Sequence, residues 1–187
     1  MTTTQLPESY REIGHIDLQK DKKLALLVNG LALVIIIPLG ILGVMRQPIP
    51  DFFSGKFLPL LAVLPCFVLY IILHELVHGI FMKAFSGQKP HYGFTLLYAY
   101  AGSGAYFDRT HYLIIALAPV VIWGAVLLVV CALVPPVWFW TAYLIQILNL
   151  SGAAGDFYAT YRMLFRLPAN VLTQDTGVAM TFFIPEE

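Results

Sequence analysis

The sequence predicts an all-α integral membrane protein with four transmembrane helices, a small cytoplasmic β-hairpin region and a short β-like C-terminal tail. Three observations support this fold class. Of the 187 residues, 59% are hydrophobic and only 12% are charged, which is too little polar surface for a soluble domain of this length. Four apolar runs each reach the roughly 20 residues that a bilayer requires. Basic residues gather in segments that would lie on one side of that bilayer.

The four apolar runs are bounded by basic residues, prolines or polar clusters, and residues 1–187 are expected to form a single membrane domain. Pro135 and Pro136 separate the last two runs, which should therefore form a tight antiparallel helical hairpin. The first 23 residues contain no apolar core of the signal-peptide type, so the first run is expected to direct the chain to the membrane. The predicted transmembrane helices cover residues 24–45, 57–82, 112–134 and 137–161.

Two segments outside these runs predict β structure on the cytoplasmic side. Residues 91–107 are rich in aromatic side chains and contain a Gly-Ser-Gly turn signal. Residues 171–184 place Asp175, Thr176 and Gly177 between two apolar stretches, a pattern typical of a short hairpin.

The distribution of basic residues predicts the orientation of the chain. Of the 11 basic residues, only Arg46 and Lys56 fall between the first and second runs. The others precede the first run, join the second to the third, or follow the fourth, so both termini are predicted to be cytoplasmic. The formal net charge is zero and no long basic run occurs, which leaves nucleic-acid binding without electrostatic support.

The motif HELVH, residues 74–78, lies inside the second apolar run. His74 and His78 are four residues apart, so they share one helical face about 6 Å apart along the axis. Such a pair can bind one zinc ion, and Glu75 can take a proton from water beside the metal. The alternative is a pair of structural histidines hydrogen-bonded to their neighbours, with Glu75 at a surface.

The membrane setting favours the metal site over that alternative. A charged side chain in the middle of a span costs ~2.5–3.5 kcal/mol, so such groups mark functional sites. Every acidic, basic or histidine side chain within the four runs belongs to one set, namely His74, Glu75, His78 and Asp156. Asp156 is the charged candidate for a third ligand. It lies six residues before Arg162, much as His78 lies five before Lys83, so the two match in predicted depth.

A polar stripe in the fourth run adds Asn149 to the candidates. Asn149 and Asp156 are seven residues apart and differ by only about 20° around a helix. A substrate or oxyanion contact is one interpretation of Asn149. Hydrogen bonding between helices is the other, and the sequence does not choose between them.

HELVH in the second span, the aromatic β-like loop, ALAP at 116–119 and NLSGAAGD at 149–156 resemble a bacterial family of small zincin peptidases that is distantly similar to the site-2 intramembrane metalloproteases. The resemblance implies that His74, His78 and Asp156 bind one Zn²⁺, that Glu75 is the general base and that Asn149 binds substrate. It also implies a multi-pass protein of the bacterial inner membrane. The chain departs from the site-2 pattern because no proline follows Asn149 closely and Phe157 follows Asp156.

The predicted function is therefore a zinc-dependent intramembrane metalloprotease that hydrolyses peptide bonds of membrane-associated peptides or proteins near the cytoplasmic face. One alternative is a non-catalytic zinc-binding membrane scaffold or regulator, which gives no reason for the costly Glu75 carboxylate. The other is a metal or proton transporter. Transporters line their path with polar groups from several spans, and the first and third runs offer almost none.

Overall fold

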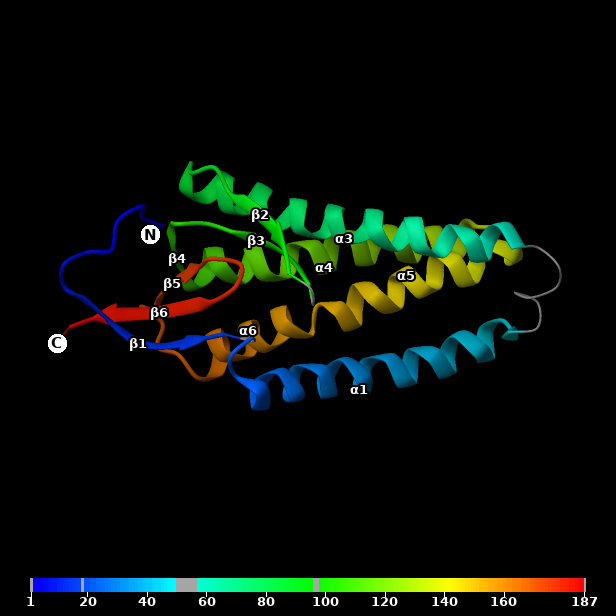
Figure 1. Ribbon diagram of the computed structural model, residues 1–187, viewed down its shortest axis with the longest axis horizontal. Helices are drawn as coiled ribbons and strands as arrows, with labels where there is room; N and C mark the ends of the chain where they lie inside the picture. Colours follow the sequence, from blue (N-terminus) through cyan, green and yellow to red (C-terminus); the bar gives the residue numbers. More distant parts are fainter. Residues whose placement is uncertain (1, 18, 50–56, 96–97, 187) are drawn as a thin grey trace. The chain divides into compact units, whose positions relative to one another are not determined.

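A computed structural model describes residues 2–17, 19–49, 57–95 and 98–186 of the chain (Figure 1). It contains α-helices, one short 3-10 helix and two antiparallel sheets. In chain order the elements are β1 (Tyr10–Ile16), α1 (Lys22–Arg46), α3 (Phe57–Ser86), β2 (His91–Phe94), β3 (Ala99–Gly102), β4 (Tyr106–Asp108), α4 (Arg109–Leu133), η1 (Pro136–Trp138), α5 (Phe139–Gly152), α6 (Ala154–Phe165), β5 (Leu172–Asp175) and β6 (Met180–Pro185).

Three helices, α1, α3 and α4, are long and apolar enough to cross a membrane. Their 25, 30 and 25 residues contain the first three predicted spans, apart from one residue at the end of the third. Only Gly43 is buried within α1, and most of its other residues are exposed, as suits a helix that faces lipid. The protein therefore has the character of a membrane protein, and helices dominate its fold.

The fourth predicted span, 137–161, is not one continuous helix. The chain forms η1, then α5, and leaves the helical path at Ala153 before α6 begins. Gly152 and Gly155 flank this break, and glycine is about 1 kcal/mol less favourable in a helix than alanine. The 14 residues of α5 are fewer than the roughly 20 that a crossing needs. Four transmembrane helices are therefore not confirmed, and the described residues contain three candidate spans.

The chain divides into two compact units, and the boundaries between them fall inside α1, α3, α4 and α6, in α3 between His74 and Glu75. Unit 1 comprises Met1–Leu26, Glu75–Pro119 and Asp156–Glu187. Its sheet has the strand order β1-β6-β5-β4, so the C-terminal hairpin lies between the N-terminal strand and β4 (Figure 1). Its buried core draws on both sheets and on α3, α4 and α6, with Met82, Phe107, Met163, Val171 and Phe182 at most 1% exposed.

The predicted C-terminal hairpin is confirmed. Asp175 pairs with Met180 across the turn, and the Asp175 carboxylate accepts a hydrogen bond of 2.7 Å from the Gly177 N–H. Gly177 has a φ of +79°, and a Cβ there would collide with the Tyr100 ring. Glycine is therefore required at this turn both by its backbone conformation and by the close packing of β3.

The other β prediction needs correction. Residues 91–107 do not form one hairpin, because β2 pairs with β3 while β4 pairs with β5 in the larger sheet. The Gly-Ser-Gly stretch, which the sequence suggests as a hairpin turn, does not join two paired strands. Gly102 is close-packed, since a Cβ there would lie 2.5 Å from the Thr176 carbonyl, and the Gly-Ser-Gly stretch carries the chain from one sheet to the other. Strand β1 was not predicted at all. Within it only Ile16 is buried, so its sequence lacks a clear apolar face.

Unit 2 comprises Leu27–His74 and Val120–Gly155. Polar and aromatic side chains of α5 tie its helices together. The Tyr143 hydroxyl donates to Leu39 O of α1 at 2.8 Å, and Thr141 Oγ1 donates to Pro59 O of α3 at 2.9 Å. Gly43 lets α1 approach, because a Cβ there would lie 2.9 Å from the Trp140 ring. Small residues and such hydrogen bonds are the usual means of packing helices in lipid.

Candidate functional site

The HELVH motif lies on α3 between Pro65 and Gly79, in a stretch without helix-breaking residues. His74, Glu75 and His78 each present one ligand atom, and these atoms all lie within 4.8 Å of one another. The histidines are 8% and 9% exposed, and Glu75 is half-buried. One turn of helix thus gathers two nitrogen donors and a carboxylate in a protected setting, as its spacing predicts.

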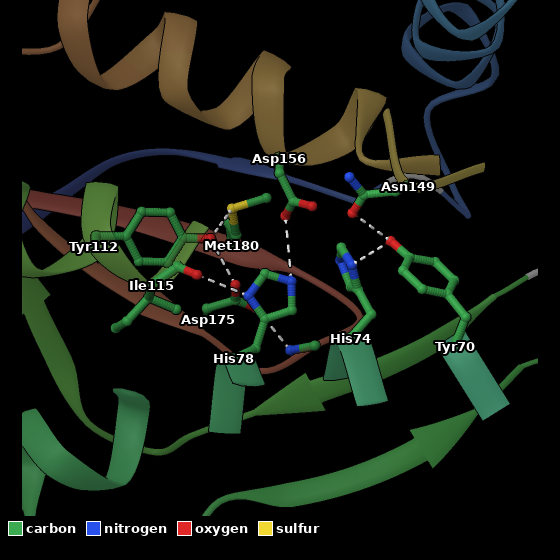
Figure 2. Close-up of polar contacts among 10 residues, drawn as sticks. Tyr70, His74, His78, Tyr112, Ile115, Asn149, Asp156, Asp175 and Met180 are labelled. Carbon is green, nitrogen blue, oxygen red and sulfur yellow. Dashed lines mark hydrogen bonds and ion pairs between the residues drawn. The ribbon is translucent and has the colours of Figure 1, made fainter. Parts of the chain in front are cut away.

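His78 is held in one orientation by the backbone of α4. Its Nδ1 lies 2.8 Å from Ile115 O, so Nδ1 carries the proton and donates it to that carbonyl (Figure 2). In a neutral imidazole the other nitrogen, Nε2, then carries the lone pair. Metal-binding histidines commonly donate their second N–H to a carbonyl or carboxylate in this way.

Asp156 lies beside His78, as the sequence predicts. Its Oδ1 is 3.6 Å from His78 Nε2 (Figure 2). Two ligands on one tetrahedral zinc, each bonded at about 2.0–2.1 Å, are separated by about 3.3 Å. The donor types and the separation of this pair therefore fit two ligands of one zinc ion, whereas the group whose ligand atoms all lie within 4.8 Å of one another is His74, Glu75 and His78.

The helix break at Ala153 helps to place this carboxylate. It puts Asp156 in the first turn of α6, whose exposed N–H groups favour a negative charge. The uninterrupted apolar run did not predict this helix break. The break at Ala153 lies three residues before the candidate ligand Asp156.

His74 is oriented by side chains rather than by backbone. Its Nδ1 lies 2.8 Å from the Tyr70 hydroxyl, which in turn donates to Asn149 Oδ1 at 2.9 Å (Figure 2). Asn149 also donates from Nδ2 to Val120 O at 3.2 Å and is 0% exposed. Of the two interpretations of Asn149, hydrogen bonding between helices is the one for which the structure supplies contacts.

Glu75 is contacted by the smaller sheet. The backbone N–H of Ala101, in β3, interacts electrostatically with its carboxylate. Strand β3 is held nearby by its pairing with β2 and by the Ser103 N–H, which donates to Asp175 O at 2.7 Å. A donor of fixed position at the carboxylate steadies the group to which the sequence assigns proton transfer.

Tyr70, Tyr112 and Asp175 have roles beside the site that sequence reasoning missed. The half-buried Asp175 carboxylate accepts a 2.6 Å hydrogen bond from the Tyr112 hydroxyl and interacts electrostatically with His78 and Asp156. Burial raises the pKa of Asp175 above 3.8, although the bonds from Tyr112 and Gly177 act in the opposite direction. Only Tyr70 left a signal in the sequence, because it precedes His74 by four residues and shares its helical face.

A model of the family described as "Putative zincin peptidase" matches residues 67–172, which is more than half of the chain. The chain belongs to this family. No curated protein and no solved structure matches it. The matched region contains the HELVH motif, Asn149 and Asp156. Membership in the zincin peptidase family and the His-Glu-His group indicate a metallopeptidase and imply zinc. The distant likeness to site-2 proteases stays a prediction.

The Tyr112–Asp175 contact predicts a pH-dependent effect on stability. The pKa of Asp175 is raised in the folded state, so its contribution to stability is full below pH 3.8 and is lost as the pH rises through the folded pKa. Tyr112→Phe removes a donor to the ionised carboxylate and should lower the free energy of unfolding by about 1–3 kcal/mol at pH 8, and by less at pH 4. Thermal unfolding in detergent micelles measures this difference.

Asp175→Asn provides the matched background for this measurement. Without the carboxylate, Tyr112→Phe should cost less and the same amount at both pH values. Equal costs at pH 4 and pH 8 in the parent would contradict an ionised acceptor at this hydrogen bond.

Proposed function

We propose that the protein is a zinc-dependent intramembrane metalloprotease that cleaves membrane-associated peptides or proteins near the cytoplasmic face. One observation carries this proposal. His78 of a candidate membrane span has its Nδ1 bonded to Ile115 O and its Nε2 3.6 Å from the Asp156 carboxylate, an arrangement that fits two ligands of one zinc ion. His74, one helical turn earlier, would be the third ligand.

The chemistry follows from the residues around that position. When bound, zinc supplies Lewis acidity to the scissile carbonyl and to the attacking water. Glu75 takes a proton from that water at its carboxylate and then passes it to the leaving amine. The Ala101 N–H interacts electrostatically with the Glu75 carboxylate.

The cytoplasmic location rests on the basic residues. Nine of the 11 lie before α1 or in its first turn, from the end of α3 to the start of α4, or in α6 and beyond it. Lys83, in the last turn of α3, is five residues beyond His78, about 7–8 Å along the helix. This orientation requires a fourth crossing between α4 and the C-terminal hairpin, and the α5–α6 segment would provide it.

The zinc site predicts a loss of metal in Asp156→Ala. The parent should carry about one zinc per polypeptide, and the variant should lose most of it because one of three protein ligands is absent. Elemental mass spectrometry on detergent-purified protein measures the content. Asp108→Ala is the matched control, since Asp108 also pairs with a histidine, His111, at 2.7 Å but lies outside the motif. A folded parent that takes up no added zinc would refute the site.

Glu75→Gln separates a protease from a zinc-bound scaffold or regulator. The variant should keep its zinc but lose about 10²–10⁴-fold in cleavage rate, the usual contribution of a general base. The measurement is mass spectrometry of new N-termini from a peptide library in detergent micelles. Glu12→Gln, in β1, is the control. Equal cleavage by Glu75→Gln and the parent would point to a non-catalytic role.

We further propose that an extended substrate adds as a strand to the outer edge of β2. Among the described residues, β2 pairs only with β3. Tyr92 and Phe94 of β2 are 49% and 74% exposed, while the Tyr92 hydroxyl packs over Gly79, the residue after His78. The strand thus combines an open edge with proximity to the motif. Strand addition recognises the substrate backbone, which must be locally unwound before its peptide bond can be cleaved.

Proline at this edge should slow cleavage. Phe94→Pro removes a backbone N–H from β2 and distorts its edge, whereas Phe94→Ala removes only the side chain. We expect Phe94→Pro to cleave the peptide library much more slowly than Phe94→Ala, with both variants unfolding near the parental temperature. Parental cleavage rates in a folded Phe94→Pro would eliminate strand addition at β2.

A further inference from the structure

Tyr70 and Asn149 form a buried hydrogen-bonded chain that ends on His74. We infer that both are positioning residues, which hold the His74 ring in the tautomer and orientation that zinc binding requires. This inference rests on the zinc site proposed above and concerns two residues that do not themselves bind the metal. It assigns Asn149 a function through Tyr70 instead of a contact with substrate.

The direction of the hydrogen bonds determines the tautomer. The Tyr70 hydroxyl has one hydrogen and donates it to Asn149 Oδ1 at 2.9 Å. The same oxygen lies 2.8 Å from His74 Nδ1, so in that contact it accepts. His74 Nδ1 therefore carries the proton, and in the neutral ring Nε2 carries the lone pair with which zinc is bound.

The amide of Asn149 is itself fixed, which gives the chain its direction. Nδ2 donates to Val120 O at 3.2 Å, so Oδ1 is the atom turned to Tyr70. An inverted amide would place Oδ1 against the Val120 carbonyl, two acceptors with no hydrogen between them, and would lose that bond. Gly124 allows this approach, because a Cβ there would lie 3.2 Å from Nδ2.

Burial makes the chain costly to break. Tyr70, His74 and Asn149 are 7%, 8% and 0% exposed, so water does not readily replace a missing partner. A buried polar group that loses its partner costs about 1–3 kcal/mol. The two histidines of the motif are thus held by different means, since His78 uses the Ile115 carbonyl while His74 depends on side chains that mutation can remove.

Tyr70→Phe tests the inference with little change in shape. The purified parent and variant are titrated with zinc against a competing chelator, and with Co²⁺ while its visible absorption is followed. We expect zinc affinity to fall about 10–100-fold, the usual effect of losing a group that orients a metal ligand. Tyr143→Phe is the matched control. It removes another half-buried tyrosine hydroxyl of unit 2, which is bonded to Leu39 O and lies far from the motif in sequence. Its zinc affinity should equal that of the parent.

Asn149→Ala tests whether the two residues act as one chain. Alone it should weaken zinc binding, and in the Tyr70→Phe background it should add little, because its link to His74 is already broken. Gln146→Ala, three residues earlier on α5, should leave zinc affinity unchanged. Fully additive losses, or equal losses in Tyr143→Phe or Gln146→Ala, would overturn the positioning role in favour of general loosening of the helices.

Two further outcomes separate this inference from the zinc site. If the parent binds zinc, His74→Ala loses it and Tyr70→Phe binds as tightly as the parent, the positioning role is wrong and the site stands. If the folded parent binds neither zinc nor Co²⁺, both proposals fall.

Discussion

The hydrogen bonding of imidazole nitrogens inside an apolar helix is the constraint on which the rest of the structure depends. Two histidines buried in a candidate membrane span cannot leave their N–H groups to water, so each needs a hydrogen-bond partner within the protein. His78 finds one in the Ile115 carbonyl and His74 in the Tyr70 hydroxyl. The bond to Ile115 joins α3 to α4, and the onward bond from Tyr70 to Asn149 joins α3 to α5. The two histidine bonds also set the tautomers that expose metal-binding lone pairs.

Irregular backbone and glycines also help to place polar side chains near the motif. The interruption at Ala153 ends α5 after Asn149 and begins α6 before Asp156, so two polar residues of one apolar run belong to two helices. A Cβ added to any of five glycines would lie within 3.2 Å of a neighbouring atom. They are Gly43, Gly79, Gly102, Gly124 and Gly177. Close approach of backbone and polar side chains is therefore a recurring feature on both sides of the division in α3.

The β elements give unit 1 functions that helices alone would not supply. Strand β3 contributes an N–H that interacts electrostatically with Glu75, and the end of β5 contributes the half-buried Asp175 carboxylate. The turn and β3 are interlocked through Ser103, Gly102 and Gly177. The Glu75 and Asp175 carboxylates thus have backbone N–H groups and a tyrosine hydroxyl beside them. These groups fix their positions more firmly than the positions of exposed side chains are fixed.

Composition and apolar run length predicted four membrane-crossing helices, and three of the described helices are long and apolar enough to cross. The His-Glu-His group and the nearness of Asp156 were predictable because they depend on helical periodicity and on the cost of charge in lipid. The C-terminal hairpin was also predictable, since Asp175 and Gly177 determine their turn locally. Only the tertiary structure decided four other features. These are the helix break at Ala153, strand β1, the pairing of β4 with β5 in the larger sheet, and the hydrogen-bonded chain from Tyr70 to Asn149. Each depends on which distant atoms meet, such as Asn149 with Tyr70 or β1 with β6, and such contacts leave no periodic trace in one sequence.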